Sequence, residues 1–182
     1  HLIEKNNFFI TSINKNKNFL TDENIFDFGI KPLNPSSEYG YFVTKKINKN
    51  INKVTKFIEK PNTKIARSII KKKGYWNSGM FLVRKDSLIN NYKKFQPIIY
   101  KNCLKSVIKS KRIKNIYTLN KNFYNQASNK SFDYAILEKV KKINAIKLDI
   151  PWSDLGSWKE ICKMYERNKN KYIKKNNIYY RP

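Results

Sequence analysis

The sequence predicts an α/β layered domain with a mixed sheet. Short apolar runs typical of strands alternate along the chain with segments whose apolar residues recur at helical spacing. The chain has 182 residues, 40% of them hydrophobic, which is enough for one domain with a proper core. Polar residues follow several of the predicted strands, where ligands bind in sheets of this class. We expect residues 1–168 to form the domain and the Lys/Asn-rich residues 169–182 to be an exit segment.

The elements are expected in a regular order. Asn62 can cap a helix that Gly74 stops, and Pro97 is suited to open another. The full expectation is a helix over residues 1–18, strands over 24–32, 39–44 and 54–58, a helix over 62–73, a strand over 75–83, a helix capped by Asp86 or Ser87, a helix from Pro97, a short helix within 131–140, a strand over 143–150 and a helix over 158–165.

The charge is strongly basic, with 39 Lys+Arg against 13 Asp+Glu and a formal net charge of +26. The basic residues are nearly all lysine and are scattered among Asn, Ile and Tyr. Arginine, whose guanidinium group binds phosphates and bases through two parallel hydrogen bonds, is scarce. We interpret this as drift toward A/T-rich codons. We therefore expect no specific nucleic-acid partner, although a basic nucleic-acid-binding module stays an alternative. The charge favours anionic substrates.

Several classes of protein are disfavoured. The single histidine, His1, argues against a zinc site or a histidine triad, and no apolar run is long enough to span a membrane. Cys103 and Cys162 are far apart and are expected to be reduced thiols of an intracellular protein. We expect a cytoplasmic protein with no membrane partner.

Asp154 lies on a tight turn between a predicted strand and a predicted helix. Gly156 is placed to relieve the backbone and Ser157 to cap the helix. A carboxylate at the mouth of a strand can hold Mg²⁺ over a substrate phosphate, whereas the simpler interpretation is a helix cap between two core tryptophans.

Other strand ends carry polar residues with two interpretations each. Lys60 can neutralise a phosphate and Glu59 can accept from sugar hydroxyls, but the two also suit a surface pair closing a strand. Asn77 can bind a hydroxylated ligand or form a turn, and Gly40 can admit a ligand or mark a bulge. Asp133 and Glu138, near the short helix within 131–140, are interpreted as a cap and a surface charge rather than as an acid/base pair.

Taken in order, six stretches resemble the bacterial mannose-1-phosphate guanylyltransferases of the sugar-nucleotidyltransferase superfamily. They are residues 28–32 (FGIKP), 38–41 (EYGY), 57–61 (FIEKP), 75–81 (YWNSGMF), 131–135 (SFDYA) and 152–158 (WSDLGSW).

The resemblance implies a Rossmann-like nucleotidyltransferase fold and transfer of GMP from GTP to mannose 1-phosphate, giving GDP-mannose and diphosphate for glycan synthesis. By matching position, Lys60 would contact the sugar phosphate and act with Asp154 in catalysis. Glu59, Asn77 and Gly40 would hold the mannose, and Asp154 would bind Mg²⁺. A homo-oligomer is compatible with the sequence, which leaves the oligomeric state open.

The sequence departs from the family in three places. The family's glycine-rich nucleotide loop is absent, and the second metal-binding Asp of the family would fall just before His1. Asp27 stands where the family has a small hydroxyl residue. We therefore expect the C-terminal part of a catalytic domain, lacking the N-terminal nucleotide-binding part and unable to turn over alone. A nucleotidyltransferase for another sugar 1-phosphate or base stays an alternative.

Overall fold

The computed structural model describes residues 1–49, 51–158, 161, 174–175 and 178–179. The chain divides into two units. The larger comprises Ser12–Leu148, and the smaller combines His1–Thr11 with Asp149–Pro182. Helix α1 (Asn6–Asn16) runs from the smaller unit into the larger and is followed by the short 3₁₀-helix η1 (Lys17–Phe19).

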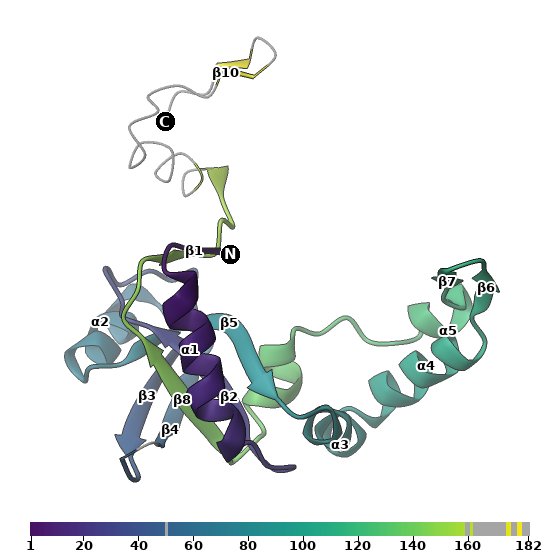
Figure 1. Ribbon diagram of the computed structural model, residues 1–182, viewed down its shortest axis with the longest axis horizontal. Coiled ribbons are helices and arrows are strands. Elements are labelled where there is room, and N and C mark those ends of the chain that lie inside the picture. Colours follow the sequence, from purple (N-terminus) through teal and green to yellow (C-terminus); the bar gives the residue numbers. More distant parts are fainter. Residues whose placement is uncertain (50, 159–160, 162–173, 176–177, 180–182) are drawn as a thin grey trace. The chain divides into compact units, whose positions relative to one another are not determined.

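The larger unit is built on five strands that close into a barrel (Figure 1). The strands are β2 (Ile25–Ile30), β3 (Tyr41–Lys46), β4 (Asn52–Ile58), β5 (Tyr75–Val83) and β8 (Ile143–Leu148). Their order is β2-β5-β3-β4-β8, and β8 pairs with β2 in parallel while the other pairs are antiparallel. The predicted α/β fold with a mixed sheet is confirmed.

Helical segments lie between the barrel strands in the chain. They are α2 (Thr63–Lys71), α3 (Lys85–Phe95), α4 (Pro97–Ile108), α5 (Lys121–Asn125) and the π-helical turn η2 (Asp133–Leu137). A hairpin of β6 (Lys111–Ile113) and β7 (Ile116–Thr118) lies between α4 and α5 in the chain. In the described residues, no helix combines the length and apolar character needed to span a membrane.

The core lies between the barrel and η2. Ala135, Ile136 and Leu137 of η2 are at most 1% exposed and pack with buried strand residues that include Ile25 and Phe42. The Gln96 side chain donates a buried 3.0 Å hydrogen bond to the carbonyl of Ala135, which satisfies a backbone acceptor of the irregular turn. These contacts hold η2, and hence Asp133 at its start, against the barrel.

The smaller unit contains two short antiparallel pairs. One joins β1 (Leu2–Ile3) to β9 (Trp152–Ser153), and the other joins β10 (Lys174–Lys175) to β11 (Ile178–Tyr179). The first pair brings the beginning of the chain beside the stretch that carries Asp154.

The sequence-based elements are largely confirmed, because short apolar runs specify strands and caps specify helix ends. Asn62 accepts the Ile65 N–H at 2.9 Å, as expected of a helix cap, and Pro97 occupies the first turn of α4. α2 ends at Lys71, close to the predicted stop at Gly74, and the left-handed residue that follows it is Lys73, with φ of 56°, rather than the glycine. Gly74 is instead required by space, because a Cβ there would lie 2.9 Å from the Ile69 carbonyl oxygen.

Three predictions need correction. Residues 1–18 are not one helix, because Leu2 and Ile3 pair as a strand before α1 begins at Asn6. The α3 cap position is Arg84, with no side-chain cap bond, rather than Asp86 or Ser87. The β6–β7 hairpin and α5 were not predicted, since their side chains are mostly exposed and lack the periodicity that burial imposes.

Candidate functional site

Gly40, Glu59 and Asn77 are brought together from three strand ends of the barrel. The Asn77 N–H donates to the Gly40 carbonyl at 2.8 Å, where β3 and β5 pair. A Cβ added at Gly40 would lie against Glu59 Oε2 and 3.3 Å from Asn77 Cβ. The glycine is therefore needed for close approach rather than for a special φ. The three residues predicted to hold a sugar share one site.

Asp133 belongs to the same site. The Asn77 amide nitrogen donates a 2.6 Å hydrogen bond to Asp133 Oδ1, while Asn77 Oδ1 accepts from the Gly79 N–H at 2.8 Å. Both ends of the amide are thus fixed. The prediction of Asp133 as a helix cap is wrong, since its carboxylate binds a side chain of β5. The signal that could have found it was the stretch 131–135, which matched the family in order and spacing.

Asp27 lies in the middle of β2 and is 0% exposed. Neither of its carboxyl oxygens has a hydrogen-bond partner among the described residues. Burial, reinforced by the charges of Asp133 and Glu59, raises its pKa well above the usual 3.8. Burial therefore favours the protonated, neutral form of Asp27. Sequence reasoning noted it only as a departure from the family pattern.

Glu59 is the third acid of this group, which we call the carboxyl cluster: Asp27, Glu59 and Asp133. Its Oε2 is buried without a hydrogen-bond partner in the described part of the chain. Burial and the charge of Asp133 raise its pKa, the ammonium of Lys60 lowers it and Glu138 raises it. Asp133 lies close enough to the other two acids for its charge to raise the pKa of both.

Lys60 stands at the rim of the carboxyl cluster. It is exposed, and its backbone is left-handed with φ of 43°, which turns the chain sharply after β4. That conformation costs about 1 kcal/mol in a residue other than glycine. Its charge acts on Glu59, so the ammonium lies close to the sugar-binding residues that the sequence predicted.

Asp154 lies in the smaller unit. Its Oδ1 accepts the Gly156 N–H at 3.1 Å, which closes a local turn. The left-handed residue of the turn is Leu155, with φ of 55°, so the expectation that Gly156 relieves the backbone is wrong. Gly156 instead makes room for the carboxylate, because a Cβ there would lie 2.5 Å from Asp154 Oδ2.

The helix predicted after Asp154 begins as expected. Trp158 and Ile161 are helical, and the Ile161 N–H donates to the Ser157 carbonyl at 3.1 Å. The rest of that helix, with Cys162, lies outside the described residues. On the other side, Leu2 pairs with Ser153, so the antiparallel register places His1 opposite Asp154. The His1 ring stacks on Trp152 with ring centroids 5.8 Å apart.

Asp154 and the carboxyl cluster can be compared with the ligands that Mg²⁺ requires. This ion binds through one or two carboxylates and leaves its other positions to water and substrate phosphates. The half-buried Asp154, with its carboxylate on a turn, suits such a role as one ligand. The described residues contain no group of three or more His, Cys, Asp or Glu placed to hold a metal. In the carboxyl cluster, burial raises the pKa of Asp27 and of Glu59, which favours their protonated forms over the ionised forms that bind a metal.

The chain belongs to the nucleotidyl transferase family, whose model matches residues 9–171. It is 30% identical over 174 residues to a mannose-1-phosphate guanylyltransferase of Escherichia coli, covering 92% of this chain and 38% of that protein. It is 34% identical over 142 residues to the xanthan biosynthesis protein XanB of Xanthomonas campestris, covering 78% of this chain and 30% of that protein. The chain thus spans about a third of the length of the relatives it matches.

Solved structures show the same fold. A structure titled mannose-1-phosphate geranyltransferase from Thermus thermophilus superposes with a TM-score of 0.77 at 18% identity, over 90% of this chain and 47% of that one. A structure titled mannose-6-phosphate isomerase from Helicobacter pylori gives 0.74 at 26% identity, over 84% of this chain and 61% of that one. The expected membership of the sugar-nucleotidyltransferase group is therefore confirmed at the level of family and fold.

Proposed function

We propose that this chain carries the sugar-phosphate side of a mannose-1-phosphate guanylyltransferase. The observation that carries the proposal is the joining of Gly40, Glu59 and Asn77 at one site, with Glu59 Oε2 buried and lacking a hydrogen-bond partner among the described residues. A buried acceptor of this kind is suited to receive a hydroxyl of a ligand. Family membership and the names of the relatives supply the reaction class.

In the proposed reaction, an oxygen of the mannose 1-phosphate attacks the α-phosphorus of GTP. The bond between that phosphorus and the oxygen bridging to the β-phosphate breaks, and diphosphate leaves as GDP-mannose forms. Lys60 neutralises the sugar phosphate as a mobile cation at the rim of the site. Glu59 accepts from a sugar hydroxyl and Asn77 orients the ring, while Gly40 keeps Glu59 seated. Catalysis then rests on positioning and charge neutralisation.

Asp154 is proposed as a ligand of Mg²⁺, which would screen the negative charge of the triphosphate when bound. The turn closed by Gly156 orients the carboxylate for this role. The register of β1 with β9 sets His1 opposite Asp154, so the β1 strand lies beside the turn that carries this carboxylate. We place the reaction in the cytoplasm, with GDP-mannose supplied to glycan synthesis.

A substrate panel on the intact protein tests the proposal. We expect diphosphate release with GTP and mannose 1-phosphate, and at least tenfold lower kcat/KM with ATP, UTP or dTTP. Preference for another nucleotide or for glucose 1-phosphate would establish the alternative of a different sugar or base. A protein that transfers no nucleotide but binds RNA with a steep salt dependence would instead be the basic nucleic-acid-binding module.

The metal role has its own test. Asp154→Asn should remove most of the activity and raise the Mg²⁺ concentration needed for half of what is left, since one charged ligand is lost. Asp149→Asn removes an equal charge from an exposed position of the same unit and should leave the Mg²⁺ requirement unchanged. Equal Mg²⁺ dependence of the two variants would overturn the assignment of Asp154 as a ligand.

A further inference from the structure

The distal arm, which we define as Pro97–Asn125, exposes an unusual amount of apolar surface. It contains α4, the β6–β7 hairpin and α5, and Figure 1 shows the hairpin beside α5, beyond the end of α4. In α4 only Ser106 is buried, and α5 has no buried residue. Large apolar side chains more than 60% exposed are Ile98, Ile108, Ile113, Ile116 and Tyr117. Exposed apolar side chains gathered on one segment mark a contact surface.

The tip of the arm concentrates this surface. Ile113 and Ile116 are cross-strand partners on either side of a two-residue turn, so their side chains share one face of the hairpin. They are 67% and 70% exposed. Lys114 occupies the turn with φ of 54°, and Lys111 lies on the face that the isoleucines share. The tip is therefore an aliphatic pair flanked by two lysines.

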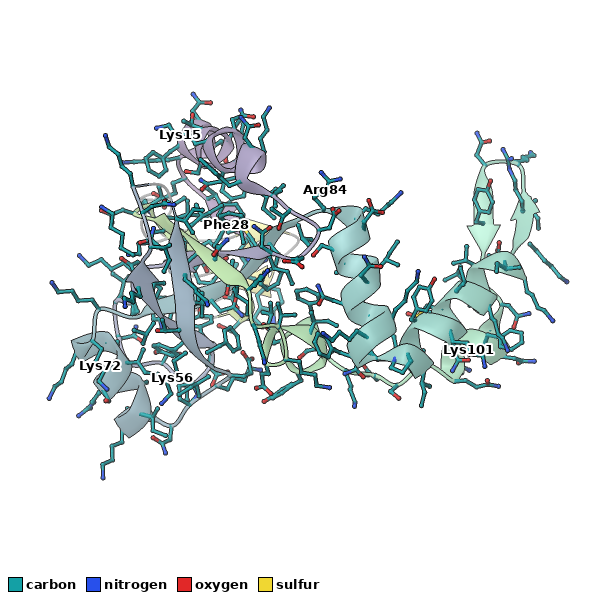
Figure 2. The ribbon with its side chains drawn as sticks, turned by 90° about the horizontal axis from the view of Figure 1, so that it is seen from below. Lys15, Phe28, Lys56, Lys72, Arg84 and Lys101 are labelled. Atoms are coloured by element: carbon teal, nitrogen blue, oxygen red, sulfur yellow. The ribbon has the colours of Figure 1, made fainter. Side chains whose placement is uncertain are left out.

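A second apolar stripe lies on α4. Leu104 and Ile108 are one turn apart and are 43% and 70% exposed, while Ser106 on the opposite side of the helix donates to the Asn120 carbonyl at 2.9 Å. Lysines recur along α4 and at its C-cap at intervals of four residues, at Lys101, Lys105 and Lys109. Figure 2 shows Lys101 among the side chains of the arm. α4 thus presents apolar and cationic side chains together.

The charged residues of the arm and of the segments that flank it in the chain are all basic. Residues 87–132 contain ten Lys or Arg and no Asp or Glu. A second copy of the chain packed on this face would bring like charges together, which is unfavourable. The partner must therefore be anionic.

The residue types select among anionic partners. Nine of the ten basic residues are lysine. Protein interfaces favour arginine and are depleted of lysine, and nucleic-acid readout also relies on arginine and on stacked aromatic rings. An anionic lipid surface attracts lysine and arginine alike and accepts aliphatic side chains at the boundary of its acyl region. Exposed isoleucines with lysines fit that surface best.

We propose that the arm docks on an anionic phospholipid bilayer, with Ile113 and Ile116 entering the interface and the lysines around them on the headgroups. This departs from the sequence-based expectation of no membrane partner, which rested on the missing spanning segment. Docking on a surface needs no such segment. The inference is independent of the proposed reaction, because no residue of the arm is assigned to it.

Vesicle co-sedimentation of the intact protein tests the proposal. We expect binding to vesicles of equal parts phosphatidylglycerol and phosphatidylcholine, and none to phosphatidylcholine alone. Ile113→Ser with Ile116→Ser should weaken binding about tenfold for each isoleucine. Lys111→Gln with Lys114→Gln should weaken it about thirtyfold, since each lysine near an anionic surface contributes about fivefold. All four positions are exposed, so the fold should be retained.

Matched controls separate the tip from the general charge. Leu33→Ser with Ile47→Ser removes exposed apolar side chains outside the arm, and Lys64→Gln with Lys71→Gln removes two charges from α2. These variants should bind as the unaltered protein does, apart from a uniform effect of net charge below about threefold. The proposal is overturned if neither vesicle is bound, or if controls and tip variants weaken binding equally. It is also overturned if the tip isoleucines instead hold an oligomer together, seen by light scattering, or if the tip lysines are needed for RNA binding alone.

Discussion

The amide nitrogen of Asn77 donates a 2.6 Å hydrogen bond to Asp133, fifty-six residues further along the chain. The bond joins the beginning of β5 to the first residue of η2. It fixes the orientation of Asn77, whose other amide atom is held by the Gly79 N–H. A residue that sequence reasoning dismissed as a helix cap thus positions one that it selected for sugar binding.

A double-mutant cycle should show this coupling. Asn77→Ala and Asp133→Ala should each lower the free energy of unfolding by about 2 kcal/mol, because a partly buried hydrogen bond to a charged group is lost. The double variant should lose little more than either single one, since the bond is lost only once. Urea unfolding measures all four proteins. Losses that simply add would show that the two residues act independently.

The buried acid Asp27 should make stability fall as pH rises. Its folded pKa lies well above the value of 3.8 that an unburied Asp has, so the folded state holds a proton that the unfolded state releases. The stabilisation is complete below about pH 4, and it is lost by at most about 1.4 kcal/mol per pH unit until the folded pKa is passed. Glu59, whose pKa is also raised, adds a change of the same sign.

The variant Asp27→Asn isolates this contribution. It keeps the shape of the side chain but has no proton to lose, so unfolding free energies from about pH 4 to about pH 8 should decline less steeply than in the unaltered protein. Asp86→Asn, which alters an acid in the first turn of α3, serves as the control and should leave the slope unchanged. Identical pH slopes for all three proteins would show that Asp27 does not hold the extra proton.

Gly40→Ala should weaken sugar-phosphate binding selectively. The added Cβ would displace Glu59 Oε2 and press on Phe57 Cζ, 3.3 Å away. We expect KM for mannose 1-phosphate to rise about tenfold with KM for GTP nearly unchanged, as when one charged hydrogen bond to the sugar is lost. Steady-state kinetics of the intact enzyme measure both constants.

Gly79→Ala is the matched control for that substitution. Nothing lies within 4 Å of its added Cβ, but the φ of +73° strains any residue other than glycine. It should cost about 1 kcal/mol of stability and leave KM for mannose 1-phosphate unchanged. If both variants raise that KM equally, the contact with Glu59 is not the cause.

Lys60→Gly should separate stability from activity. Lys60 has a φ of 43°, so glycine relieves strain of about 1 kcal/mol while the ammonium is lost. We expect a protein as stable as the original or more so, with kcat/KM lowered at least about a hundredfold, as for a charge that contacts a phosphate.

Lys73→Gly makes the same exchange at φ of 56°, directly after α2. It should raise stability in the same way and leave kcat/KM unchanged. Thermal unfolding and initial rates measured on the two variants give both quantities. Equal activity of Lys60→Gly and Lys73→Gly would remove Lys60 from the site.

The sequence by itself determined most of the fold. Short apolar runs predicted β2, β3, β4, β5 and β8, because strands that form the barrel must bury apolar side chains. The ordered short motifs also selected Glu59, Lys60 and Asn77 as candidate site residues, because their positions at strand ends are a local property. The exposed hairpin escaped prediction because no burial constrains its residues.

Tertiary structure alone decided how the site is composed. Asp27 and Asp133 lie far apart in the chain, and only the pairing of β2 with β5 and the packing of η2 bring them to Glu59 and Asn77. Their effect on one another depends on distance and burial, which no local pattern encodes. For the same reason only the structure shows that Asp27, which in the sequence is simply a departure from the family pattern, is a fully buried acid with a raised pKa.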